Sequence, residues 1–260
     1  MKAVTHKTAK PSHYNKESES YDAFNEARSA LINSTIEKVL KNYNATSVLD
    51  LTCGTGSQVF WLTRRGFTVV GSDINAKMLK IAKEKALREN LAIKFIKGDM
   101  RTIQVGEFDA VITIFNAIGH LTKSDFEIAL RNIHRNLKKD GIYIFDIANL
   151  DYYLAGKNIT ELTIDWLTTS GDTQFREIQY STLTAEGILT FHSTVITQKL
   201  KSDEKPKISK RAQTLQIYSA GPLKEILTKN GFKVLEQLGI DGSRFVEERT
   251  DRILTIAQKI

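Results

Sequence analysis

Short apolar runs alternate with segments of helical spacing over the first 150 residues of the chain. Between Asn25 and Tyr43, apolar residues recur as on one face of an amphipathic helix. The run 108–114 is nearly all apolar, which is typical of a parallel strand covered on both faces. Further strands are predicted at 48–51, 67–72, 91–96, 141–147, 233–238 and 253–259. This alternation predicts an α/β fold with a doubly wound, mostly parallel sheet of seven strands.

A glycine-bearing turn follows the first predicted strand. The segment 48–57 reads VLDLTCGTGS, and Gly54 and Gly56 lack a Cβ that would keep a ligand away from the backbone. The second strand ends at Asp73, roughly twenty residues after the turn, where an acid can accept hydrogen bonds from ribose hydroxyls. Both features belong to the carboxyl ends of neighbouring strands, so the sequence predicts a nucleotide-type pocket at that edge.

Two cofactor classes fit this geometry, and residues around the turn separate them. A dinucleotide fingerprint has a third glycine where this chain has Val59. Asp50 precedes the turn, and its carboxylate would repel a pyrophosphate but attract the ammonium of a methionine moiety. These residues favour S-adenosylmethionine, with S-adenosylhomocysteine as its product, over NAD.

The segment D-L-T-C-G-T-G, which begins at Asp50, resembles the first motif of the class I S-adenosylmethionine-dependent methyltransferases, commonly D-x-G-C-G-T-G. The family's first glycine is replaced here by Thr52, which crowds the turn. The resemblance implies a Rossmann-like fold, an adenine site formed by an acid and an apolar residue after the third strand, and a fourth motif facing the transferred methyl. It implies these cofactor-binding residues: Asp50, Thr52, Gly54, Gly56, Asp73, Ile74, Asp99, Met100 and Phe115.

Within that family, the order Asp-Tyr-Tyr-Leu-Ala-Gly-Lys-Asn-Ile after the fifth strand resembles the glycine and sarcosine N-methyltransferase branch. In that branch an arginine on the helix before the first motif binds the methionine carboxylate, which implies Arg28, with Tyr21 or Tyr14 beside it. Ala148 and Asn149 stand where glycine-type enzymes have an arginine for the carboxylate of the acceptor. This departure indicates an uncharged or differently charged small acceptor.

The pattern changes after residue 149 and divides the chain. Segments 150–218 alternate and are rich in threonine and aromatic residues, which predicts an antiparallel β insert that caps the substrate. It would separate an S-adenosylmethionine-binding core at 45–149 from a C-terminal completion of the sheet at 219–260. Residues 1–44 are expected to form a tail, mobile over about its first 20 residues, and a capping helix. Ser124 and Glu127 have the spacing of a capping box that opens a helix.

Methyl transfer from a sulfonium is a direct in-line displacement, in which the protein positions the acceptor and excludes water. His120 and Asn116 follow the fourth strand and are candidate partners for the proton of an amine acceptor, and Tyr218 is a candidate for closing the pocket. Two of these residues have an alternative structural role. His120 could instead hydrogen-bond to the backbone, and the side-chain amide of Asn116 could instead close the turn after the fourth strand.

The composition narrows the remaining classes. The 260 residues contain one cysteine, no apolar run long enough to span a membrane and no secretory signal, so a cytoplasmic protein with no membrane partner is expected. The histidines, acids and cysteine lack the spacing of metal ligands, so no metal is expected.

The net charge of +7 comes from scattered lysines, densest at 199–211, where no aromatic residues are interleaved for base stacking. A small-molecule acceptor is therefore favoured over nucleic acid, and a monomer or a homodimer is expected. An RNA-modifying methyltransferase and a non-catalytic S-adenosylmethionine-binding module stay open as alternatives, with a dehydrogenase as a distant one.

Overall fold

The computed structural model describes residues 5–13, 15, 21–156, 158–202 and 204–260. A seven-stranded sheet forms its centre. The strands of this sheet are β1 (Ser47–Asp50), β2 (Thr68–Asp73), β3 (Lys94–Lys97), β4 (Phe108–Thr113), β5 (Leu137–Ala148), β10 (Phe232–Leu238) and β11 (Arg252–Lys259).

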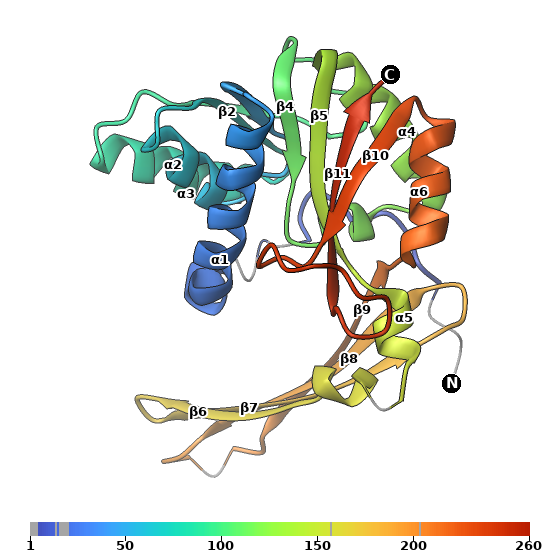
Figure 1. Cartoon of the computed structure of the whole chain (residues 1–260). Coiled ribbons are helices and arrows are strands. Elements are labelled where there is room, and N and C mark those ends of the chain that lie inside the picture. The colour runs from blue at the N-terminus through green and yellow to red at the C-terminus, as the bar shows by residue number, and fades with distance from the viewer. Residues whose placement is uncertain (1–4, 14, 16–20, 157, 203) are drawn as a thin grey trace.

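These strands lie in the order β10-β11-β5-β4-β1-β2-β3, with helices on both faces (Figure 1). β1 to β5 pair in parallel, whereas β11 runs antiparallel to both β5 and β10. Val48, Leu49 and Val111, in the middle strands, are fully buried, which explains why these strands read as apolar runs. The predicted doubly wound, mostly parallel, Rossmann-like sheet is confirmed.

The helices cover the sheet in two groups (Figure 1). α1 (Tyr21–Asn42), α2 (Ser57–Thr63) and α3 (Ala76–Arg88) share one hydrophobic cluster with the sheet. α4 (Lys123–Arg135) and α6 (Ala220–Lys229) share the other cluster. The strands are packed between the two clusters, and the loops that form the site begin at their ends.

The start of α4 differs from the sequence prediction. Thr122 is the N-cap, and its hydroxyl accepts the N–H of Asp125 at 3.2 Å. The predicted capping box of Ser124 and Glu127 is wrong, because Thr122 has the extended backbone that an N-cap needs, whereas Ser124 already lies within the helix.

The residues after β5 form α5 (Leu150–Leu154), η2 (Asn158–Leu162) and a four-stranded antiparallel sheet, so the predicted insert after the fifth strand is confirmed. Leu189 and Leu215 of this sheet are buried in the core, whereas Trp166, Leu167 and Ile208 are exposed, so the sheet projects from the core (Figure 1). The predicted domain boundaries stay predictions. The strands of the antiparallel sheet are β6 (Ile164–Ser170), β7 (Thr173–Leu183), β8 (Ile188–Lys199) and β9 (Lys207–Gln216).

The expected mobile tail is wrong for residues 5–13, which we call the N-terminal cover. The ring nitrogens of His6 lie 2.9 Å from the carbonyl oxygen of Leu121 and 2.9 Å from the hydroxyl of Thr214. The N–H of Ala9 donates to the carbonyl of His120 at 2.9 Å. Contacts with two distant parts of the fold therefore hold the cover in place.

None of the described helices has both the length and the apolar character needed to cross a membrane. Among the same residues, no group of histidine, cysteine and acidic side chains is arranged to hold a metal ion.

Candidate active site

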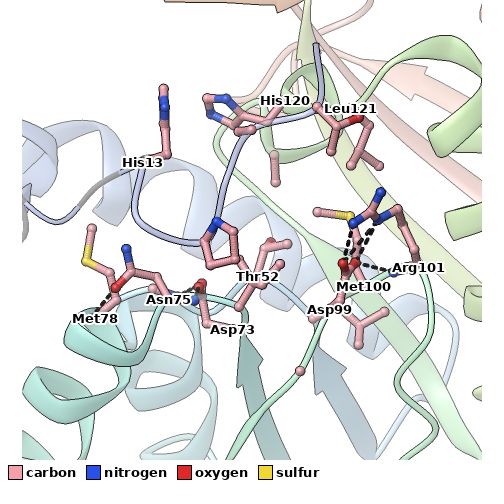
Figure 2. A pocket seen from close by; sticks show the side chains of 18 of the residues that line it. His13, Thr52, Asp73, Asn75, Met78, Asp99, Met100, Arg101, His120 and Leu121 are labelled. Atoms are coloured by element: carbon pink, nitrogen blue, oxygen red, sulfur yellow. Dashed lines mark hydrogen bonds and ion pairs between the residues drawn. The ribbon is translucent and has the colours of Figure 1, made fainter.

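A pocket lies at the carboxyl ends of β1, β2 and β4 (Figure 2). It encloses about 810 Å³, including its open mouth. Four of the residues predicted from the sequence lie outside its lining: Asp50, Gly56, Asn116 and Tyr218. Eight other predicted site residues line the pocket together: Thr52, Gly54, Asp73, Ile74, Asp99, Met100, Phe115 and His120.

The glycine turn after β1 forms one wall. Gly54 has a left-handed φ of 52°, and a Cβ built there would meet no atom within 4 Å, so a ligand can approach this backbone. Gly56 has a different role, because a Cβ there would stand 2.5 Å from the ring of Phe60. Gly54 leaves room for a ligand, whereas Gly56 lets the turn pack against α2.

Asp73 ends β2 and faces the turn. Its Oδ2 accepts the N–H of Gly54 at 2.8 Å, and its Oδ1 accepts the N–H of Asn75 at 2.7 Å. Burial raises the pKa of Asp73, although these N–H donors work in the opposite direction. Each carboxylate oxygen has a second lone pair, so Asp73 can still accept hydrogen bonds from hydroxyl groups in the pocket.

Asp50 ends β1, just before the turn, and is 1% exposed. Its Oδ1 accepts the N–H of Thr52 at 3.1 Å, but its Oδ2 and the hydroxyl of Thr52 have no partner among the described residues. Burial raises the pKa of Asp50 to about 8, and the charge of Asp73 adds to the effect. A buried carboxyl oxygen without a partner is costly, so this position fits a ligand that brings a cationic donor.

The opposite wall is formed by Asp99, Met100 and Arg101 (Figure 2). Arg101 donates to both oxygens of Asp99 at 2.6 to 3.1 Å, and to Asp125 at 3.0 Å. Burial acts to raise the pKa of Asp99, but the hydrogen bonds from Arg101 outweigh it and hold that pKa below its ordinary value. Asp99 is therefore an oriented anion.

The N-terminal cover closes the pocket from above, where Figure 2 shows His13 and His120. The hydroxyl of Thr8 donates to Asp125 and accepts the N–H of Thr122 at 3.1 Å. Asp125 also accepts from Arg101, so a chain of hydrogen bonds connects the cover to Asp99 on the wall.

His120 ends η1 (Ala117–His120) and lies with its ring centroid 5.0 Å from that of His13. Burial lowers the pKa of His120 to about 3, with smaller effects from His13 and His6. The imidazole is therefore neutral at pH 7, and its basicity is too low for it to hold a proton there. It can still orient a ligand through a hydrogen bond.

The other two predicted catalytic residues have structural surroundings. Asn116 Oδ1 accepts the N–H of Ala148 at 2.7 Å, so its side chain bonds to β5 rather than within its own turn. Tyr218 is 3% exposed, packs against Phe126 with ring centroids 5.8 Å apart, and has a hydroxyl without a partner among the described residues. Burial raises the pKa of Tyr218, so it stays a phenol. A catalytic role for either residue stays a prediction.

Comparison with known proteins agrees with this geometry. Residues 48–141 match the family model of a methyltransferase domain. Glycine/sarcosine N-methyltransferase from Parasynechococcus marenigrum (strain WH8102) is 37% identical over 123 residues, which cover 46% of this chain and 44% of that protein. The chain belongs to the class I S-adenosylmethionine-dependent methyltransferases. Its cofactor is S-adenosylmethionine.

Solved structures show the same fold as this methyltransferase. An S-adenosylmethionine-dependent methyltransferase from Clostridium acetobutylicum ATCC 824 superposes with a TM-score of 0.73 at 18% identity, covering 95% of this chain and 98% of that one. S-adenosylmethionine-bound CalS10, an amino pentose methyltransferase from Micromonospora echinaspora, gives a TM-score of 0.69 at 17% identity, covering 92% and 96%. The matched segment covers less than half of the glycine/sarcosine enzyme, so the acceptor of this chain does not follow from that match.

Two residues predicted to bind the methionine carboxylate of the methyltransferase cofactor are not placed. The side chains of Tyr21 and Arg28, on α1, lie outside what the structure describes, as does Tyr14. Their contact with the cofactor stays a prediction.

Several residues of the methyltransferase pocket were not predicted, among them Asn75, Arg101 and the N-terminal cover. Asn75 had a local signal, because asparagine directly before a helical segment is a typical N-cap, and its side chain accepts the N–H groups of Lys77 and Met78. The cover had none, since His6 contacts residues 115 and 208 positions away.

Proposed function

We propose that this methyltransferase transfers the methyl group of S-adenosylmethionine to a nitrogen or oxygen of a small-molecule acceptor by direct in-line displacement. The observation that carries the proposal is the buried Oδ2 of Asp50, which has no partner among the described residues and belongs to the last residue of β1, just before the open backbone of Gly54. An ammonium satisfies this carboxyl, whereas a pyrophosphate would be repelled by it. When bound, the sulfonium supplies an already activated methyl group.

The pocket residues divide the binding of this cofactor among them. Asp73 has lone pairs left for ribose hydroxyls, and its two backbone donors fix its orientation. Ile74 and Met100 both line the pocket and offer apolar surface to an adenine ring. Asp99 is an acceptor for the adenine amino group, since Arg101 keeps it ionised. Thr52 adds a buried hydroxyl near the glycine turn.

A small acceptor is favoured over a polymer because the N-terminal cover lies across the pocket. Nitrogen is favoured over oxygen because the similar glycine/sarcosine enzyme is named an N-methyltransferase. At the end of β5, Ala148 is apolar and the amide of Asn149 is fully used, donating to the carbonyls of Glu247 and Thr250 and accepting the N–H of Asp151. Neither residue supplies a cation for an acceptor carboxylate.

An amine acceptor has to arrive neutral, because its lone pair forms the new bond. His120, with a pKa of about 3, does not take up a proton at neutral pH, so we assign it the orientation of the acceptor or cofactor rather than general-base catalysis. The proton released from nitrogen then passes to solvent.

An RNA acceptor has less support. In the basic segment 199–211, Lys199 pairs with Glu204 at 3.5 Å and Arg211 pairs with Glu177 at 2.9 Å. None of the basic residues of this segment lines the pocket. The segment therefore offers a partly neutralised surface without an acceptor site.

The proposal is tested by calorimetric titration with S-adenosylmethionine, S-adenosylhomocysteine and NAD, followed by a screen of amines, amino sugars, hydroxyl compounds and RNA that detects S-adenosylhomocysteine release. We expect the two methionine derivatives to bind, NAD not to bind, and turnover with an amine. Turnover with RNA alone would overturn the small-molecule assignment. Cofactor binding without turnover on any class would favour a non-catalytic module, and binding of NAD alone would overturn the cofactor itself.

A further inference from the structure

Two consecutive residues in the turn after β4 have left-handed backbones although neither is glycine. Phe115 has a φ of 64° and Asn116 a φ of 58°. Such a conformation is costly for a bulky aromatic residue and persists only where its surroundings impose it. Phe115 lines the cofactor pocket, so whatever imposes this turn also sets one wall of the site.

The turn is held from β5. The N–H of Phe115 donates to Oδ1 of Asp146 at 2.6 Å, and the side chain of Asn116 accepts the N–H of Ala148 at 2.7 Å. Asp146 is 0% exposed and is the partner of Arg252, the first residue of β11. One carboxylate oxygen therefore serves the strained turn, and the other serves a buried cation.

β11 lies beside β5 (Figure 1), and the antiparallel register of the two strands places this cation. Arg252 pairs with Ala148, and since alternate residues of a strand share a face, its side chain lies on the same face of the sheet as Asp146. Its guanidinium carbon lies 5.7 Å from the centre of the Phe115 ring, close enough for a cation–π contact. Arg252 thus contacts both the anchor and the residue that is anchored.

We propose that Asp146 and Arg252 are positioning residues for methyl transfer, which hold Phe115 in the left-handed turn at the cofactor pocket. Asp146 fixes the backbone of the turn, and Arg252 fixes both the carboxylate and the aromatic ring. Neither residue lines the pocket, so each acts through Phe115. The proposal rests on the methyltransferase function proposed above.

A purely structural ion pair offers the matched comparison. Asp109, on the same sheet, pairs with Lys138 at 2.7 Å and accepts hydrogen bonds from Thr46 and Ser47 at the amino ends of β1 and β4, and it does not line the pocket. If Asp146 and Arg252 served stability alone, removing either pair would have the same consequences for the cofactor site.

Two double variants test the proposal without leaving an unpaired buried charge. D146N/R252M keeps an oxygen that accepts the N–H of Phe115, whereas D146A/R252M removes it, and D109A/K138M is the control. The wild-type protein and each variant are titrated with S-adenosylmethionine, thermal unfolding is recorded, and the ¹³C resonance of methyl-labelled S-adenosylmethionine is measured in the complex.

We expect D146A/R252M to weaken binding about tenfold, the low end of what release of a strained residue costs, and to shift the methyl resonance. D146N/R252M is expected to retain most of the affinity and a smaller shift, and the control is expected to lose stability only. Equal affinities and resonances in all four proteins would overturn the proposal. If D146A/R252M does not fold, the resonance in D146N/R252M decides, since an unchanged one shows that Arg252 does not position the ring. Failure of the wild-type protein to bind would instead refute the methyltransferase function on which the proposal rests.

Discussion

The two ends of the central sheet use the same residue type in opposite ways. At the amino ends of the strands, Asp109 accepts four hydrogen bonds from Thr46 and Ser47 and one from Lys138, at 2.7 to 3.0 Å. Burial acts to raise its pKa, but these donors outweigh it and hold the pKa of Asp109 well below the ordinary value. Every oxygen of this carboxylate is used by the protein itself.

At the carboxyl ends, Asp50 is more deeply buried than Asp109 and accepts fewer hydrogen bonds. Only its Oδ1 has a partner among the described residues, and burial raises its pKa to about 8. The left-handed turn at Phe115 lies at the same end. The contrast teaches that the two ends of the strands serve different purposes. At the amino ends the polar groups are hydrogen-bonded within the protein and contribute to stability. The carboxyl ends keep an unpartnered polar atom and a strained turn, which a bound ligand can use.

The largest effect that separates the two ends is expected for D73A compared with D109A. D73A removes the acceptor proposed for both ribose hydroxyls and is expected to weaken S-adenosylmethionine binding about 100-fold, because hydrogen bonds to a charged group are worth about 1.5–3 kcal/mol each. D109A is expected to lower the free energy of unfolding by about 2 kcal/mol for the same reason, without changing the affinity. Calorimetry and urea unfolding measure both quantities.

Two results would contradict this difference between the two ends of the sheet. If D73A bound the cofactor normally, or if D109A weakened binding as much as D73A does, the two ends of the sheet would not differ in function. S-adenosylhomocysteine is the second probe, because it presents the same ribose without the sulfonium charge.

The sequence predicted the structure well where the structure depends on residues that are close together in the sequence. The glycine turn, Asp73 and the apolar strands were predictable because each follows from a short segment. Even there, the third strand begins later than predicted: the N–H of Leu91 bonds to the carbonyl of Ala86 and closes α3, so β3 starts at Lys94.

Contacts between distant segments were not predictable. Arg252 meets Asp146 across 106 positions because β11 lies antiparallel beside β5, and no local pattern encodes that register. The N-terminal cover depends in the same way on Leu121 and Thr214. His120 was a reasonable candidate for a base, but its low pKa results from burial beneath this cover.

A smaller effect is expected from loosening the cover. T8V removes the hydroxyl that bonds to Asp125 and Thr122 while preserving side-chain shape. Since Asp125 connects to Asp99 through Arg101, we expect S-adenosylhomocysteine to dissociate up to about tenfold faster, as for the loss of one hydrogen bond to a charged group. Stopped-flow displacement measures the rate. T228V, which removes an exposed hydroxyl on α6, is the control, and equal rates in both variants would show that the cover does not retain the ligand.

The smallest effect, and the one that distinguishes the two ends by sign, is the response to pH. The pKa of Asp50 is raised in the folded protein, so its contribution to stability is full below about pH 4 and falls as pH rises toward about 8. The pKa of Asp109 is lowered, so its contribution is present at neutral pH and is lost in acid.

A cationic ligand beside Asp50 favours the carboxylate and therefore releases its proton on binding. Affinity for S-adenosylmethionine is expected to rise about fivefold from pH 7 to pH 8, the change that one proton with a pKa of about 8 produces. Titrations in buffers with different ionisation enthalpies count the released proton. D50N, which has no proton to release, is expected to bind with a flat pH profile, and D109N is expected to retain the wild-type profile. If the affinity of the wild-type protein did not change over this pH range, the ammonium would not lie beside Asp50. Asp50 and Asp109 would then not differ in ligand binding, and the distinction between the two ends of the sheet would lose its basis.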